Sequence, residues 1–569
     1  MMMKSAAVKR LWWMACLLLL LMCGLNSASA QSSGEFGGVQ YDVKGLLRTD
    51  WALSTSGEPN PNNIGRFSTE GNSWNLMAYR FESWIKLKAD DGAAAKLGLD
   101  RVSVLIHPRF YMDLAPELDG NLKDVDLFGG LGGGNYPGNG WMAQTINVNE
   151  LVLDLPEAYV DLTKAGFNLR LGKQRIVWSP MTFVRVLDCI DGLDYRRHSL
   201  WGPVYEGFDD QRIGQWTANL TYQVPQFNQH LTKSSLQAFV SPDFEPTIYP
   251  AQGSAYSMFS SAFVFNDAAN IATARHKLVY GAAWNGTIHL ERILALLLDG
   301  NYDLSLNFVS TPQINGVTEY TAATGPNAIN GTPYLLDANG FANNKQWRDA
   351  ALRNKIIGKN DPNLSAIIDT TFPVGAPFNT NPFALGPIDV AATNVYPRVY
   401  IFGGSIQHDF KYIGTTRLEV TYTPAKQFRW LWRPGAISDG ELSIAGMLRR
   451  EFTWGVEKIS PTTLELEYWY KSRSDFFDRY ASSYEERDLP FSALTVEQPL
   501  MGQQLLFDTS VMLDVSQGGG GWIQPGVRYQ PNDHWRYEAF YNFFWGGQRD
   551  MFGEFSSFDE IFMRVGYWF

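Results

Sequence analysis

The last twelve residues of the chain, 558–569, read FDEIFMRVGYWF and constrain its fold more than any other stretch. Apolar side chains occupy every second position of this stretch: Ile561, Met563, Val565, Tyr567 and Phe569. Arg564 and Gly566 lie on the opposite side. A period of two indicates a β-strand with one apolar face. Such a strand belongs either to a soluble β-sandwich or to a barrel whose outer surface meets lipid.

Two-faced segments of this kind recur along the whole chain, many of them near the 9–11 residues that a tilted strand needs to cross a bilayer. The segment 491–498 is the weakest, and we include it because a bacterial barrel has an even number of strands. The sequence therefore predicts an all-β fold, a transmembrane antiparallel β-barrel of about 18 strands, with 16 as the alternative. The predicted strands are 38–53, 75–89, 99–112, 152–162, 167–178, 211–224, 234–241, 278–298, 302–309, 398–410, 415–423, 447–457, 462–473, 491–498, 505–515, 522–530, 535–545 and 558–569.

The connections between these strands alternate in length, as they do in outer-membrane barrels, where periplasmic turns are short and extracellular loops are long. The predicted short turns are 164–166, 299–301, 411–414, 458–461, 499–502 and 531–533. The predicted long loops are 54–72, 114–147, 179–210, 242–275, 310–396 and 475–489. The segment 310–396 is too long for an ordinary connection, so we expect an extracellular cap or a plug. We expect residues 31–569 to form a single barrel domain.

The first thirty residues have the pattern of a secretory signal peptide. Lys4, Lys9 and Arg10 precede an apolar stretch, and an Ala-Ser-Ala triplet ends at residue 30. We expect cleavage after this triplet and export to the outer membrane of a Gram-negative bacterium. After the leader there is no run of 18 apolar residues, which argues against a helical membrane protein.

Charge and residue spacing argue against several classes of function. Removal of the leader takes three cations from a formal charge of −11, leaving −14, and a nucleic-acid-binding surface is expected to be basic. The seven histidines show no metal-binding spacing, and no nucleophile elbow or phosphate-binding loop occurs. Cys189 is the only cysteine after the leader, so an internal disulfide is excluded. We expect no enzymatic activity, no metal and no cofactor.

If one face of each strand meets lipid, the charged residues on the other face line a wet lumen. The predicted pore-lining and constriction residues are Arg80, Lys86, Arg101, Arg109, Arg170, Arg185, Asp188, Asp191, Asp194 and Arg196. The later strands contribute a mixed wall that includes Glu419, Glu465 and Glu467. A transverse field of this kind would orient dipolar solutes. The charged loop 179–210 could fold inward and narrow the pore, or it could be a solvated outer loop.

The segment 169–197 contains a more specific pattern. Its matching residues are Gly172, Gln174 and Trp178, followed by Arg185, Val186, Leu187, Asp188, Ile190 and Asp194. In these it resembles an uncharacterised outer-membrane β-barrel family of proteobacteria, porin-like and known as domain of unknown function thirteen-oh-two. Members tend to carry Gly-Arg-Gln-x-x-x-Trp and then Arg-Val-Leu-Asp-x-Ile-Asn-Pro-x-Asp. Lys173 replaces the usual Arg, and Asp191-Gly192 stands where Asn-Pro is usual.

The resemblance implies a barrel with a conduit role, in a family whose genes often neighbour exporters of hydrophobic compounds. The final strand likewise resembles the closing strand of outer-membrane barrels, whose C-terminal aromatic residue is an assembly signal. That likeness assigns the signal to the five alternating apolar residues of 561–569. We therefore expect contacts with the barrel-assembly machinery, outer-membrane lipid and lipopolysaccharide.

Three functions follow from these expectations. The first is a porin-like channel for passive or gated passage of small, anionic or amphipathic solutes. The second is a structural barrel that sheathes a partner, such as a multihaem cytochrome, across the outer membrane. The third is a lipid-modifying enzyme of the outer membrane. A homo-oligomer or a periplasmic or cytochrome partner is compatible with the first two, and nucleic acid is not an expected partner.

Overall fold

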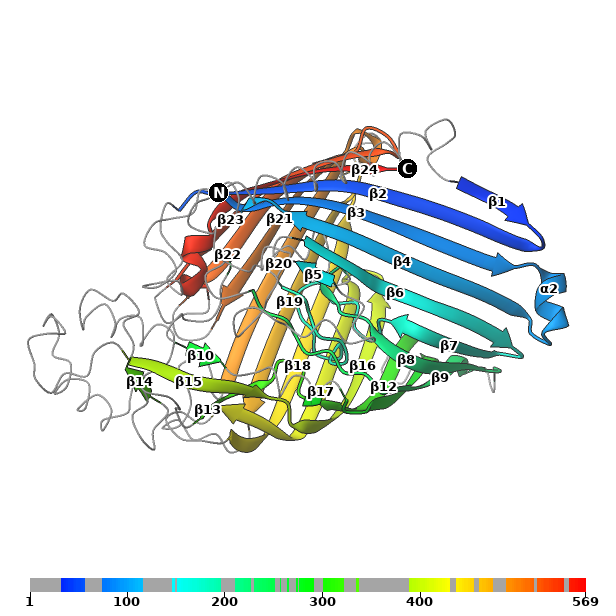
Figure 1. Cartoon of the computed structure of the whole chain (residues 1–569), viewed down its shortest axis with the longest axis horizontal. Helices are drawn as coiled ribbons and strands as arrows, with labels where there is room; N and C mark the ends of the chain where they lie inside the picture. The colour runs from blue at the N-terminus through cyan, green and yellow to red at the C-terminus, as the bar shows by residue number, and fades with distance from the viewer. Residues whose placement is uncertain are drawn as a thin grey trace, which may run out of the picture.

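A closed antiparallel barrel of 18 strands forms the wall of the part of the chain that the structure, a computed structural model, describes (Figure 1). The described residues are 32–56, 74–115, 146–148, 151–195, 210–226, 230–250, 256, 263–265, 273–274, 276–290, 300–321, 334–336, 388–429, 436–454, 460–473, 488–515, 519–546 and 552–569. In order round the barrel, the strands are β2 (Val39–Ser54), β3 (Trp74–Ala89), β4 (Arg101–Asp113), β6 (Leu151–Lys164), β7 (Phe167–Gln174), β8 (Gln215–Val224), β9 (Leu231–Ser241), β11 (Val279–Leu290), β12 (Gly300–Pro312), β16 (Arg398–Phe410), β17 (Gly414–Arg429), β18 (Ala436–Phe452), β19 (Thr462–Arg473), β20 (Asp488–Leu500), β21 (Leu505–Asp514), β22 (Gly521–Tyr529), β23 (Trp535–Trp545) and β24 (Glu560–Trp568).

The barrel closes where the last strand pairs with the first long one. β24 lies antiparallel to β2, with Trp568 opposite Leu46 and Glu560 opposite Ser54. Beyond the end of the strand, Gly45 N donates to Phe569 O at 2.7 Å and Phe569 N donates to Gly45 O at 3.0 Å. The predicted all-β barrel with 18 strands is confirmed.

The distribution of apolar and polar side chains over the two faces of the wall is the reverse of that in a water-soluble protein. Large apolar side chains point outward and are exposed, as in Leu306 at 63% and Phe402 at 49%. Polar side chains point inward and are covered, as in Glu419 at 0% and Glu467 at 1%. An outward apolar band with a polar interior is the pattern of a barrel surrounded by lipid.

The two ends of the barrel differ in their connections. At one end the neighbouring strands are joined closely, by the turn at Ala165 and Gly166, by η2 (Met501–Gln503) and by the short helix α2 (Asp91–Lys96). We call this the short-turn end; the connections at the other, long-connection end include η3 (Gly553–Phe558). Figure 1 shows α2 and the small sheet described next at opposite ends of the molecule. No helix within the described ranges is long and apolar enough to cross a membrane.

A small second sheet lies at the long-connection end. It consists of β10 (Phe263–Phe265), β13 (Val317–Tyr320), β14 (Tyr334–Leu336) and β15 (Ile388–Val395), with β15 pairing to the other three. Three of these strands fall in the predicted cap or plug 310–396, in which we predicted no strands. Two further short strands, β1 (Ser32–Phe36) and β5 (Ile146–Val148), pair with β2 and β6.

The predicted strands lie close to the observed ones, with informative differences. The weak segment 491–498 is part of β20, so the parity argument is confirmed. The predicted strand 447–457 corresponds to β18, which starts earlier, at Ala436. The first half of β18 was not predicted because it carries polar residues that face the interior. The predicted strand 167–178 ends at Gln174, where the chain leaves the wall. The predicted signal peptide, 1–30, lies outside the described residues.

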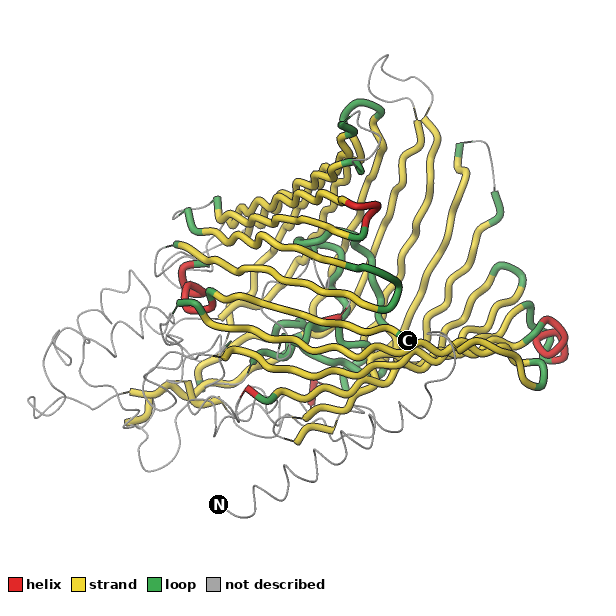
Figure 2. Tube along the Cα trace, turned by 90° about the horizontal axis from the view of Figure 1, so that it is seen from above, coloured by secondary structure: helices red, strands yellow, loops and turns green. Residues whose placement is uncertain are grey.

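At the short-turn end, β2 and the strands that follow it extend beyond β24, the strand on the other side of β2. β2 continues from Leu46, the partner of Trp568, to Val39, which pairs with Ala89 of β3. Figure 1 shows these strands running past the C-terminus to α2. Figure 2 shows loop segments among the strands near the middle of the molecule, and residues 178 and 182 of one of them contact the inner faces of β9 and β19. The fold therefore combines an extended lip at one end with chain segments in the interior.

Candidate functional site in the barrel interior

Residues 175–195, which we call the inner segment, leave the wall at the end of β7 and cross the barrel. Near its start, Trp178 Nε1 donates to Gln237 Oε1 of β9 at 2.9 Å. A few residues later the segment contacts β19, and β7 and β19 are widely separated in either direction round the barrel. The inner segment therefore spans the interior from one side of the wall to the other.

Carboxylates of the far wall hold the backbone of the inner segment. Glu467 Oε1 accepts the N–H of Thr182 at 2.6 Å, and Glu467 Oε2 accepts those of Phe183 and Val184 at 2.9 and 3.0 Å. Thr182 Oγ1 donates to Glu465 Oε1 at 2.7 Å. Backbone donors that converge on a carboxylate form strong, charge-assisted hydrogen bonds. Glu467 thus fixes three successive peptide groups against β19.

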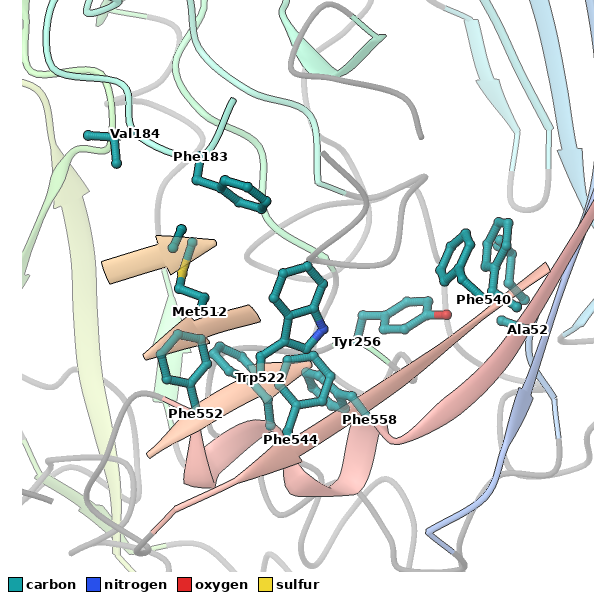
Figure 3. Packing of buried hydrophobic residues seen from close by; sticks show 14 of the residues in the cluster. Ala52, Phe183, Val184, Tyr256, Met512, Trp522, Phe540, Phe544, Phe552 and Phe558 are labelled. Atoms are coloured by element: carbon teal, nitrogen blue, oxygen red, sulfur yellow. The ribbon is translucent and has the colours of Figure 1, made fainter. Parts of the chain in front are cut away.

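Apolar side chains of the inner segment pack on aromatic residues that point into the barrel. The rings of Phe183 and Trp522 meet edge to face, with centroids 6.2 Å apart. Figure 3 shows Phe183 above a group of rings from β22, β23 and the start of η3, including Trp522, Phe544 and Phe552. This buried cluster lies inside the barrel and covers part of the wall with apolar surface.

The remainder of the inner segment turns back and is held by ion pairs and short bridges. Asp188 Oδ2 accepts Arg185 Nε at 2.9 Å and Arg212 Nε at 2.8 Å. Asp194 N donates to Gln211 O at 2.8 Å. Asp191 Oδ2 accepts the N–H of Ile176 at 2.8 Å. Burial, reinforced by the neighbouring Asp188 carboxylate, raises the pKa of Asp191 to about 8.

The chain that returns to the wall contacts the early strands through Asp210. Its carboxylate forms two hydrogen bonds with the guanidinium of Arg80, and Arg109 Nη1 approaches Asp210 Oδ1 at 3.2 Å. Arg109 also donates to both oxygens of Asp154, at 3.0 and 2.7 Å. Arg80 and Arg109 are buried. These two cations of the early wall are therefore paired with carboxylates beneath the interior segments.

The predicted site residues within the described ranges fall into four groups. Arg80 and Arg109 are buried with Asp210, whereas Lys86 and Arg101 are exposed on the inner face near the short-turn end. Arg170 Nε donates to Asp161 Oδ1 at 2.8 Å, and its guanidinium lies 4.0 Å from the centroid of the Tyr159 ring. In the inner segment, Arg185 contacts both Asp188 and Asp191, whereas Asp194 contacts Gln211 through its backbone N–H. Arg196 lies outside the described residues.

The residues that position the inner segment were not among the predicted constriction residues. The sequence predicts that Glu419, Glu465 and Glu467 face the lumen, but it does not predict which groups they contact. Their partners are backbone N–H groups, which have no signature in the sequence. In the described part of the chain, no three His, Cys, Asp or Glu side chains gather as a metal ion would require.

Comparison with known proteins gives one family and several distant folds. The family model described as "Protein of unknown function (DUF1302)" matches residues 13–569. No curated protein sequence matches the chain. The barrel is similar to OmpF of Salmonella typhi, in a complex with daunomycin, with a TM-score of 0.33 and 10% identity over 95% of this chain and 100% of the other.

Two further crystal structures show a likeness of the same order. OccAB1 of Acinetobacter baumannii has a TM-score of 0.40 and 8% identity over 93% of this chain and 95% of the other. OpdK of Pseudomonas aeruginosa, with vanillate, has a TM-score of 0.38 and 8% identity over 93% of this chain and 98% of the other. The barrel architecture itself follows from the strand pairings described above.

Proposed function

We propose that this chain, which belongs to the DUF1302 family of proteins of unknown function, is an outer-membrane channel narrowed by its own inner segment. In this proposal, small anionic or amphipathic solutes pass between the inner segment and the wall. The contact of the inner segment with Glu467 is the observation that supports the proposal most directly.

The outward face supports placement in an outer membrane. Exposed apolar residues occupy alternate positions on strands from all round the barrel, including Leu220, Tyr400, Leu466, Phe507 and Phe543. A closed barrel leaves no unpaired strand edge in the hydrocarbon, which is one of the few ways a chain can cross a bilayer. By analogy with other bacterial barrels, we place the short-turn end in the periplasm.

The interior supports a conduit rather than a solid core. Inward positions near the short-turn end, such as Lys86 and Arg101, are exposed to solvent, whereas deeper ones such as Arg80 and Glu467 are buried, and Glu467 contacts the inner segment. Cations on the inner face of the wall would favour the passage of anionic solutes. The apolar cluster that contains Trp522 would favour solutes with an apolar part. Together these features support the class of solute proposed.

The interior also bears on the alternatives. The chain's own segments cross the barrel and hydrogen-bond to both sides of the wall. A sheath would have to hold a partner protein in that same space, so this arrangement favours a channel over a sheath. No described contact specifically favours a lipid-modifying enzyme.

Planar bilayers test the proposal. The folded protein is expected to conduct ions, with a reversal potential in a KCl gradient that shows anion preference. The substitution Arg101→Gln removes an exposed lumenal cation and is expected to reduce that preference, whereas Lys96→Gln on α2 is not. Silent bilayers from protein whose barrel is folded, judged by heat-dependent migration in gels, would contradict the proposal.

A further inference from the structure

We infer that the inner face of β2, β3 and β4 at the short-turn end is a binding site for amphipathic organic anions. Its cationic part, which we call the rim, consists of Lys44, Lys86, Lys88 and Arg101. Its apolar part is the ring of Trp84. The inference deepens the proposed channel by assigning the place where a solute first binds, and it predicts binding whether or not the barrel conducts.

Strand register places these side chains on one face. Lys44 is the pairing partner of Trp84, and Lys86 follows Trp84 by two positions on the same face of β3. Further along β2 and β3, the same face carries the buried residues Asp50, Arg80 and Glu82, which identifies it as the inner face. The rim therefore opens into the barrel and not toward lipid.

The rim cations differ from the cations deeper in the same wall, which form ion pairs with carboxylates. Deeper in the barrel, Arg48 meets Asp50 at 2.8 Å, Arg109 meets Asp154 at 2.7 Å and Arg564 meets Asp50 at 2.6 Å. The four rim cations are exposed and make no ion pair within the part of the chain that the structure describes.

Asp42 is the carboxylate of β2 to β4 that lies among the rim cations, because it is the pairing partner of Lys86. Asp50 and Glu82 of the same face are buried deeper in the barrel, and Asp161 of the neighbouring β6 pairs with Arg170. Four cations and one carboxylate leave an excess of positive charge at the opening. Exposed charge of one sign at the entrance of a cleft attracts ligands of the opposite sign. The rim therefore selects anions from solution.

Aromatic rings adjoin the rim on its inner side. The Trp84 ring stacks on His107, with centroids 4.5 Å apart, and on Trp568, with centroids 5.5 Å apart. The row thus spans β24, β3 and β4 and separates the rim from the buried Glu82, whose carboxylate accepts a hydrogen bond from His107 Nε2 at 2.7 Å. Packing of a ligand's aromatic or apolar part on such rings is favourable, and so is a charge-assisted contact between a lysine ammonium group and a ligand anion.

These two surfaces together define the class of ligand. An inorganic anion meets only the rim, and a neutral aromatic molecule meets only the rings. A molecule that carries a ring and a sulfonate, carboxylate or phosphate meets both. The lip formed by β2 to β4 extends past the C-terminus, so such a ligand reaches the site from the short-turn end without crossing the inner segment (Figure 1).

Equilibrium dialysis of the full-length protein in neutral detergent tests the site. The probe is naphthalene-2-sulfonate, compared with 2-naphthol, which has no charge, and methanesulfonate, which has no ring. We expect the naphthalenesulfonate to bind at least tenfold more tightly than either. The double substitution Lys86→Gln and Arg101→Gln is expected to weaken its binding roughly tenfold, because two exposed charge contacts are lost.

A matched control and a second variant separate the two surfaces. Lys96→Gln removes an exposed cation of the same end that lies on α2, outside the inner face, and should leave binding unchanged. Trp84→Leu should weaken binding of the naphthalenesulfonate and leave that of methanesulfonate unchanged. Heat-dependent migration in gels confirms that each variant is folded.

The inference is overturned if the rim variant binds the probe as tightly as the unmodified protein, or if Lys96→Gln weakens binding equally. It is also overturned if 2-naphthol binds as tightly as the sulfonate, which would indicate partition into apolar surface only. Protein that binds the probe through the rim but is silent in bilayers would refute the channel and leave the site in place.

Discussion

Substitution of Glu467 by Gln tests whether the inner segment sets the size of the opening. Glu467 accepts three backbone N–H groups, those of residues 182–184, and its side chain is almost completely covered. Gln retains one carbonyl oxygen but places an NH₂ group where the second oxygen was. That NH₂ would face at least one backbone N–H, donor against donor.

The size of the effect follows from these contacts. Hydrogen bonds to a charged acceptor contribute about 1.5–3 kcal/mol each, and Gln loses at least one of them and the charge assistance of the others. We expect the free energy that favours attachment of the inner segment to β19 to fall by about 2–4 kcal/mol. At 1.4 kcal/mol for each factor of ten, the ratio of detached to attached segment rises roughly 30- to 1,000-fold. The packing of Phe183 on Trp522 remains, so the segment is expected to detach briefly and not permanently.

Single-channel recording in planar bilayers measures this change directly. Glu467→Gln is expected to show brief openings of larger conductance at a frequency at least tenfold above that of the unmodified protein. Adding Phe183→Ala should lengthen those openings. Glu441→Gln is the matched control, since Glu441 is another buried carboxylate of the wall but pairs with Lys426 and Lys471 and not with the inner segment.

Equal conductance and equal opening frequency in Glu467→Gln and the unmodified protein would refute the reasoning, provided that both barrels are folded. The reasoning would also be refuted if Glu441→Gln increased the conductance as much as Glu467→Gln does. That result would mean that loss of any buried wall carboxylate loosens the barrel as a whole. The specific role of residues 182–184 would then have no support.

Three further predictions concern the covered groups of the interior. Because burial raises the pKa of Asp191 to about 8 from 3.8, the folded protein holds a proton that the unfolded chain has lost; thermal unfolding should show stability falling as pH rises from about 4 to about 8, and Asp191→Asn should remove this dependence. Burial raises the pKa of Cys189 from 9.0 to about 12, so at neutral pH a thiol reagent should label it about a thousandfold more slowly than a free thiol, and Glu467→Gln should accelerate labelling. Asp210→Asn removes one of the carboxylates that pair with buried Arg80, which keeps its ion pair with Glu82, and should destabilise the fold by about 1–3 kcal/mol in denaturant unfolding.

The wall could be predicted from the sequence because its signal is local and repeated. Alternation of apolar and polar residues identifies each strand without knowledge of its neighbours. The strand that this signal nearly missed, β20, was recovered from the requirement that the strands be even in number. The first half of β18 was missed because Asp439, Gly440 and Glu441 interrupt the alternation. In the structure Glu441 faces Lys426 and Lys471, so the interruption reflects the polar interior.

The short strands of the second sheet had no comparable signal. β13 and β14 contain four and three residues, too few for a period of two to be recognised. β15 is longer, but its pairing partners come from separate connections of the chain. Such strands form because the barrel brings their connections together at one end, and a local pattern does not contain that information.

The position of the inner segment was beyond prediction for a different reason. The charges of the predicted loop 179–210 suggested that this loop could approach the basic wall, and Asp210, at the end of that loop and outside the inner segment, does pair with Arg80 there. Within the segment itself, however, Asp188 forms ion pairs with Arg185 and with the nearby Arg212, so its side chain does not attach the segment to the far wall. What attaches the segment to the far wall is its backbone, since every residue except proline offers an N–H donor. Changes at Asp188 should therefore alter the shape of the segment, whereas changes at the wall carboxylates should alter where it lies.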